Sequence, residues 1–168
     1  MAVVPLLLAV VVTSAQPTEV SAGGNWTRSE SEEKMTGAKK VKFDLAADNL
    51  LPGSDQRPEI MIFCSEGKLS LGDFHPHVQT RPNQPGFWGQ PQMRVVVRVD
   101  KNHTQRSWNW VKGEFLAMDK DTTREILGAQ IFKVQFLGPD GPQIAEFSPA
   151  GLDQGMVRKD CGLKPKKP

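Results

Sequence analysis

The segment DFHPH, residues 73–77, has the residue types and the spacing of a metal-binding motif. On an extended chain the side chains at i, i+2 and i+4 point to the same side, so Asp73, His75 and His77 would converge. Two imidazoles and a carboxylate are suitable ligands for zinc or another divalent ion. Pro76 disturbs a strand, however, and the sequence supplies no evident fourth ligand. The alternative interpretation is two solvated histidines in a proline-rich loop.

Tryptophan and phenylalanine residues form a second group with binding potential. Trp108 and Trp110 alternate along a strand-like segment and would share one face, which is either an exposed platform for a sugar or a protein, or part of the core. We favour the core. Phe87 and Trp88 lie in residues 75–92, a stretch with four prolines and two glycines. This composition predicts a long loop without regular structure, in which an exposed aromatic pair would anchor a protein partner.

The two cysteines indicate how the domain is held together. In an exported chain, Cys64 and Cys161 predict a disulfide, which would close a loop of about 100 residues and attach a terminal helix to the sheet. The rival interpretation is a nucleophilic Cys64 served by a histidine. A nucleophile needs an exposed, electropositive setting, whereas Cys64 follows the apolar run IMIF.

Other catalytic signatures are missing from the sequence. It contains no G-x-S-x-G, no H-E-x-x-H and no phosphate-cradling glycine loop. Its carboxylates do not form a pair with the pattern of a glycosidase site. We therefore predict a protein that is not an enzyme and that needs no cofactor. The formal net charge of +2 does not indicate a nucleic-acid partner, which would call for a concentrated basic face.

Both ends of the chain differ from its middle in composition. Residues 1–15 combine a short apolar run with the small residues Thr13 and Ala15, which predicts a signal peptide that is too short to span a membrane. Residues 16–40 are rich in Ser, Gly, Glu and Lys, and we expect a flexible polar leader in which Trp26 at most docks on the domain edge. Residues 164–168 are expected to form a disordered basic tail.

The middle of the chain, residues 41–163, has the pattern of an antiparallel β domain. Val41, Phe43 and Leu45 alternate with polar residues, as in a half-buried strand. Helices are expected at 119–130, capped by Asp121 or Thr122, and after Pro149. The fold predicted is an antiparallel β-sandwich or flattened barrel with two short helices, one at the C-terminus. The expected strands lie near 40–48, 59–65, 69–74, 93–100, 103–111, 112–119, 131–138 and 143–148.

The order of these segments resembles the VasI/TagO-like domain, which is associated with bacterial type VI secretion. The resemblance spans about residues 41–163. It rests on an R-P-x-L-x-I-x-C-like strand and on a closing F-x-x-x-G-L…C-G element. The matching positions are Arg57, Pro58 and Cys64 in the strand, and Phe147, Gly151, Leu152, Cys161 and Gly162 in the closing element. It implies an exported, non-enzymatic accessory or binding domain of a bacterium.

These observations together predict a periplasmic or secreted protein with an accessory or binding role and a protein partner. The Phe87–Trp88 pair is the expected contact surface. The alternative function is metal binding, or metal-dependent hydrolysis, at Asp73, His75 and His77. The sequence carries no signal of an oligomeric state.

Overall fold

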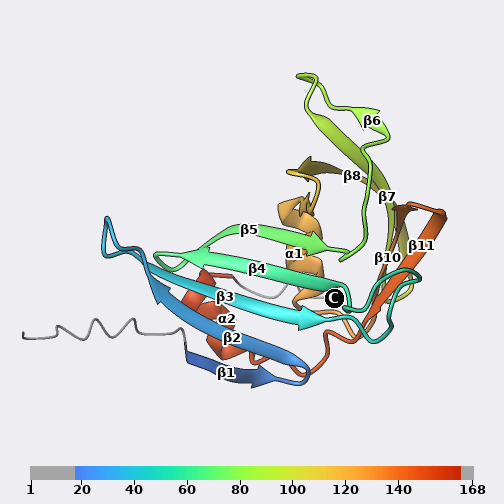
Figure 1. Cartoon of the computed structure of the whole chain (residues 1–168). Helices are drawn as coiled ribbons and strands as arrows, with labels where there is room; N and C mark the ends of the chain where they lie inside the picture. Colours follow the sequence, from blue (N-terminus) through green and yellow to red (C-terminus); the bar gives the residue numbers. More distant parts are fainter. Residues whose placement is uncertain (1–17, 164–168) are drawn as a thin grey trace, which may run out of the picture.

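The computed structural model describes residues 18–163, which form one antiparallel sheet of eleven strands and two helices (Figure 1). The order across the sheet is β1-β2-β3-β4-β5-β9-β8-β7-β10-β11, and β6 pairs with β7 outside this path. The strands are β1 (Thr18–Gly23), β2 (Trp26–Glu32), β3 (Lys39–Ala46), β4 (Glu59–Ser65), β5 (Lys68–His75), β6 (Gln84–Pro85), β7 (Pro91–Val99), β8 (Asn102–Val111), β9 (Phe115–Met118), β10 (Phe132–Gly138) and β11 (Gly141–Phe147). The helices are α1 (Lys120–Ile126) and α2 (Gln154–Cys161).

The sheet folds over itself, so that two halves enclose the core (Figure 1). Strands β1 to β5 form one half, and β9, β8, β7, β10 and β11 form the other. Phe74 on β5 lies at the centre of the core, where its ring contacts Trp108, Phe136 and Phe147. The predicted mainly β, antiparallel, sandwich-like fold with two short helices is therefore confirmed, and the sheet is not closed into a barrel.

Strand β11 ends the sheet, and its edge is covered by the loop that follows β3. The Asp48 amide donates to the Glu146 carbonyl at 2.7 Å. The Asn49 side chain donates to the Ile144 carbonyl at 2.9 Å and accepts from the Glu146 amide at 2.8 Å. These bonds satisfy backbone groups that an edge strand would otherwise expose.

The alternating patterns found in the sequence correspond to buried and exposed faces. Val41, Phe43 and Leu45 on β3 are all at most 3% exposed and point into the core, while the intervening Lys42 and Asp44 are less buried. Both Trp108 (0% exposed) and Trp110 pack in or against the core, as expected.

The expectation of a flexible leader over residues 16–40 needs correction, because β1 and β2 lie within it. The two strands pair with each other, and β2 pairs with β3. Trp26 is 1% exposed, and its indole donates to the Pro149 carbonyl at 2.8 Å. Backbone pairing and the burial of Ala22 and Trp26 order a stretch whose composition alone predicts disorder.

The stretch 75–92 also contains regular structure that was not expected. Residues 84–92 form a short hairpin, in which β6 pairs with the start of β7. Pro85 and Pro91 face each other in this pairing, at the edge of the sheet, where a residue without an amide hydrogen is tolerated. The segment before the hairpin, residues 76–83, has no strand or helix.

Helix α1 begins earlier than the sequence indicated, and α2 begins later. Asp119, rather than Asp121 or Thr122, caps α1 and accepts from the Thr122 amide at 2.8 Å. Asp153 caps α2, which therefore starts beyond Pro149. Helix α1 packs on β5, and α2 packs on β4 and β5, so both cover the inner face of the first half of the sheet.

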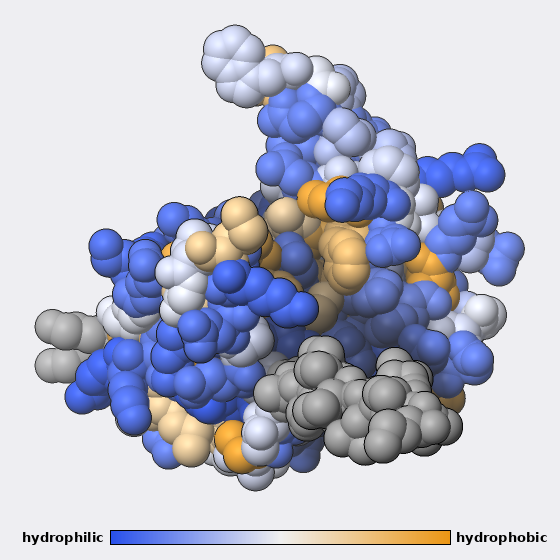
Figure 2. Space-filling model, turned by 60° about the vertical axis from the view of Figure 1, so that its left-hand side comes forward, coloured by the Kyte–Doolittle hydropathy of each residue, from blue (hydrophilic) through white to orange (hydrophobic). Residues whose placement is uncertain are grey.

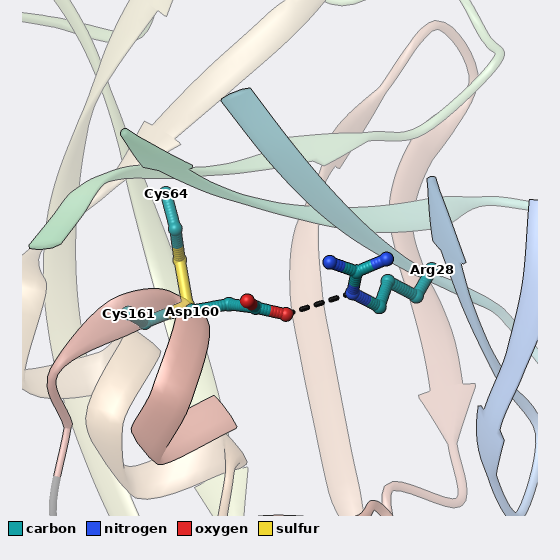
Figure 3. The surroundings of a disulfide bond; sticks show 4 residues. All are labelled: Arg28, Cys64, Asp160 and Cys161. Atoms are coloured by element: carbon teal, nitrogen blue, oxygen red, sulfur yellow. Dashed lines mark hydrogen bonds and ion pairs between the residues drawn. A yellow bond between two sulfur atoms is a disulfide. The ribbon is translucent and has the colours of Figure 1, made fainter. Parts of the chain in front are cut away.

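Cys64 on β4 and Cys161, the last residue of α2, form the predicted disulfide (Figure 3). Their Cα atoms are 5.1 Å apart. Beside it, the Arg28 Nε on β2 donates to the Asp160 Oδ2 at 2.7 Å, in a pair whose side chains are 14% and 5% exposed. The terminal helix is thus attached to the sheet by a covalent bond and by a largely buried ion pair.

Among residues 18–163, no helix has the length and apolar character needed to cross a membrane. The predicted signal peptide, residues 1–15, and the predicted basic tail, residues 164–168, lie outside the residues that the structure describes.

Candidate functional site

The β6–β7 hairpin projects from the body of the molecule and carries Phe87 and Trp88 at its tip (Figures 1 and 2). These two side chains, the aromatic tip, are 89% and 86% exposed. Their ring centroids lie 4.9 Å apart and their planes are almost perpendicular, at 89°. The two rings therefore support each other in an edge-to-face contact while both remain open to solvent.

Hydrogen bonds within the turn fix the backbone of the aromatic tip. The Gly86 amide donates to the Gln90 carbonyl at 2.7 Å, and the Gly89 amide donates to the Gly86 carbonyl at 2.9 Å. The Trp88 amide donates to the Gln90 Oε1 at 3.0 Å. Gly89 has a φ of +77°, a conformation that glycine adopts without strain.

Amide side chains join this hairpin to β8 at its base. The Gln84 Nε2 donates to the Ser107 Oγ at 2.6 Å, and the Gln92 Nε2 donates to the Asn109 Oδ1 at 2.8 Å. Residues 82–93 include no charged side chain. The hairpin therefore presents two aromatic rings on an uncharged, hydrogen-bonded support.

The predicted metal ligands are brought together only in part. Asp73 and His75 lie on the outer face of β5, and His77 follows after a turn with a φ of +52°. The imidazole rings of His75 and His77 stack at 3.7 Å between centroids. Asp73 does not belong to the group of ligand atoms that meet there. Its place is taken by Glu59, the cross-strand neighbour of His75 on β4.

The ligand atoms of Glu59, His75 and His77 all lie within 4.8 Å of one another. The His77 Nε2 is 3.7 Å from the Glu59 Oε2, too far for a hydrogen bond. This nitrogen is enclosed by the protein and has no hydrogen-bond partner. The His77 Nε2 thus has its coordination position free, with the Glu59 carboxylate nearby.

Burial shifts the pKa values of the titratable groups on the outer face of β5. It lowers the pKa of His75, and the adjacent His77 lowers it further. It raises the pKa of Asp73 to about 6. A neutral imidazole is the form that binds a metal ion, so the setting of His75 favours the ligand state at neutral pH.

A groove of about 400 Å³ crosses the outer face of strands β1 to β5. Phe63 and Leu71 supply apolar surface to it, and Lys40 and Lys42 line it as well. In Figure 2, apolar residues gather in the middle of the visible face, beneath the projecting hairpin. The groove had no signature in the sequence, because its residues come from five strands.

No family model, curated protein or solved structure matches this chain. The resemblance to the VasI/TagO-like domain therefore stays a prediction.

Sequence reasoning found the aromatic tip, His75 and His77, but it missed Glu59. A carboxylate sixteen residues before a histidine gives no local signal. The register of β4 against β5 places Glu59 opposite His75, and this register is not encoded in a local motif.

Proposed function

We propose that this chain is an exported, non-catalytic binding domain that captures a protein partner through the aromatic tip. The observation that carries the proposal is the pair of rings at Phe87 and Trp88, which are nearly fully exposed on a turn that hydrogen bonds hold in one conformation. Two large rings in water are unfavourable unless a partner covers them.

Preorganisation supports the same proposal. A binding surface that is already ordered loses little conformational entropy when a partner docks. Aromatic side chains are also the residues that most often dominate the energy of protein interfaces. The absence of charge over residues 82–93 favours an apolar pocket on the partner, because no ion must be desolvated when the tip enters it.

Export is part of this proposal. A disulfide persists in an oxidising compartment, and the Cys64–Cys161 bond joins elements that the fold places side by side. With the predicted signal peptide, it favours a periplasmic or secreted protein. The resemblance to the VasI/TagO-like domain adds the proposal that the partner belongs to a bacterial secretion apparatus.

The test is affinity capture from periplasmic extract with three forms of the full oxidised chain. Wild type and the control Met35→Ala are expected to retain the same protein, since Met35 is 92% exposed but lies far along the chain from the hairpin. Phe87→Ala/Trp88→Ala is expected to bind it at least about 30-fold more weakly, the loss typical of one removed hot spot.

Two outcomes would overturn the proposal. Equal capture by the double variant would remove the aromatic tip as the contact surface. Tip-dependent binding to phosphatidylethanolamine–phosphatidylglycerol vesicles, without any captured protein, would replace the protein partner by a membrane surface. A matching far-UV circular dichroism spectrum of the double variant is the control for folding.

Metal binding is the second candidate function, and the clustering of Glu59, His75 and His77 favours it. Three protein ligands with one position left open are also the arrangement of many hydrolytic zinc sites. The argument for an ion at this corner is independent of the aromatic tip.

A further inference from the structure

We propose that Glu59, His75 and His77 form a binding site for one divalent transition-metal ion, with zinc as the best match. The inference rests on the second candidate function and deepens it by naming the ligands and the ion. It is independent of the proposed capture of a protein partner. It also replaces the ligand set that the sequence suggested, since Glu59 takes the position expected for Asp73.

Three segments of the fold bring the ligands together. Glu59 begins β4 and His75 ends β5, and the two are paired directly across the strands. His77 lies beyond the end of β5, where its positive φ of +52° turns the chain back so that its ring stacks on His75. The Ser54 hydroxyl, from the loop before β4, lies 3.0 Å from the His77 carbonyl and holds this turn. The side chains are therefore positioned before any ion arrives.

The distances are close to those of a metal centre. Ligand atoms about 2.0–2.2 Å from zinc in a tetrahedral site lie about 3.3–3.6 Å from one another. Here the donor atoms are within 4.8 Å. The Glu59 side chain is 41% exposed, so its carboxylate has room to move toward the two imidazoles when an ion binds.

The hydrogen bonding of this corner is incomplete at His77. The His77 Nε2 is buried and has no hydrogen-bond partner. Among residues 18–163, the Glu59 carboxylate has no lysine or arginine within ion-pair distance. A buried polar atom without a partner calls for an explanation such as an absent ion, and a cation between these groups would satisfy both.

The ligand chemistry decides which metal fits. Two imidazole nitrogens and one carboxylate oxygen suit zinc, and also cobalt, nickel or copper, whereas magnesium and calcium prefer an all-oxygen set. Phe115 packs against the His75 ring at 4.5 Å between centroids and limits its rotation. A fourth position remains for water or for a ligand atom from outside the chain.

The experiment measures zinc binding to the untagged, oxidised full chain after treatment with a chelator. Isothermal titration with zinc chloride is expected to show one site per chain, and magnesium chloride none. Glu59→Gln, His75→Ala and His77→Ala are each expected to weaken zinc binding at least about 10-fold, as even the loss of an outer partner of a metal ligand does.

Two matched variants make the assignment specific. His103→Ala removes a histidine that lies at the β7–β8 end, away from β4 and β5, and is expected to leave binding unchanged. Asp73→Asn removes the carboxylate that the motif alone suggested and is also expected to bind as wild type. Loss of binding in Asp73→Asn with retention in Glu59→Gln would overturn the assignment in favour of the local motif.

Two further results would overturn the zinc site. No zinc uptake by wild type, or uptake that His75→Ala and His77→Ala leave intact, would overturn the proposal. Urea unfolding of each variant without metal shows whether the fold persists, so that lost binding is not mistaken for lost structure. Failure of the zinc site leaves the capture experiment with the aromatic tip unaffected.

Discussion

Arg28 and Asp160 join the second strand to the terminal helix, one residue before the disulfide. Their donor and acceptor atoms are 2.7 Å apart, and both side chains are largely buried. Arg28 lies on the inner face of β2, opposite Phe43 on β3, so its guanidinium reaches α2 across the core side of the sheet. The hydrogen bond to Asp160 is the main cause of the raised pKa of Arg28.

Replacement of Arg28 by methionine is expected to lower the free energy of unfolding by about 2–4 kcal/mol, because Asp160 keeps its buried charge without a partner. The measurement is urea unfolding followed by tryptophan fluorescence. Arg28→Met/Asp160→Leu is expected to recover most of the loss, since neither charge remains. The control Glu30→Gln removes the other ion-pair partner of Arg28. The Glu30 side chain is 43% exposed, so this variant should change the free energy of unfolding by less than about 0.5 kcal/mol. Equal effects of Arg28→Met and Glu30→Gln would contradict this account.

Loss of the Cys64–Cys161 disulfide is expected to be costlier than loss of the ion pair. The bond links residues 97 positions apart, and the chain-entropy model assigns about 4–5 kcal/mol to a loop of this size. Cys64→Ser/Cys161→Ser, compared with wild type in urea, measures the difference. The mass of the intact non-reduced protein, two hydrogens below that of the dithiol, checks that the bond forms. An unchanged unfolding midpoint after full reduction would show that α2 is held by packing alone.

Asp119 links the cap of α1 to the core, and its effect on stability is expected to depend on pH. Burial acts to raise the pKa of this carboxyl, but hydrogen bonds from the Thr122 hydroxyl, the Thr122 amide and the Trp108 indole outweigh it, so the pKa is lowered. A depressed folded-state pKa means that the stabilisation is present above the unfolded value of 3.8 and is lost as the pH falls through the folded value.

Asp119→Ala is therefore expected to destabilise the protein by about 1–2 kcal/mol at pH 7. The difference from wild type should shrink as the pH falls below the unfolded value of 3.8 and through the lower folded-state value, because the carboxyl then becomes protonated in both states. Urea titrations at a series of pH values measure it, with Asp121→Ala as a control on the first turn of the same helix, where the side chain is 74% exposed. A difference that stays constant down to pH 2 would mean that the negative charge contributes nothing.

Local patterns predicted the parts of the fold whose stability is local. The alternation of Val41, Phe43 and Leu45 predicted a half-buried strand because each strand must present one apolar face. The segments β1 and β2 escaped prediction because their pattern is mostly polar. Strand β1 pairs with β2, and β2 pairs with β3. The docking of Trp26 near Pro149 adds a contact with a residue over a hundred positions away.

The candidate metal site of Glu59, His75 and His77 also depends on contacts that local sequence patterns do not predict. The i, i+2, i+4 spacing of Asp73, His75 and His77 assumes an extended chain, but Pro76 and the positive φ of His77 end β5. The chain then folds back, and the third ligand atom comes from Glu59 across the strand pair. Sequence spacing predicts side-chain direction inside one element, whereas a site built from two elements needs their register.

The turn between β1 and β2 packs closely against the backbone of residues 150–151, which precede α2. Gly24, in the turn between β1 and β2, has a φ of +56°, and a methyl group added to it would overlap the Ala150 carbonyl oxygen. Gly151 is equally close, since a Cβ built on it would lie 2.9 Å from the Gly24 Cα. The neighbouring bond from the Asp153 amide to the Ala22 carbonyl, at 2.7 Å, holds the two turns together.

Gly24→Ala is therefore expected to combine backbone strain with a clash against main-chain atoms that cannot move without breaking this contact. Gly53→Ala is the matched control, because Gly53 has a φ of +80° but a Cβ there would meet nothing within 4 Å. We expect about 1–2 kcal/mol of destabilisation for Gly53→Ala, from strain alone, and at least about 1 kcal/mol more for Gly24→Ala. Urea unfolding of both variants measures the difference. Equal losses would mean that the β1–β2 turn can leave residues 150–151 without cost, and that pairing with β3 alone secures the hairpin.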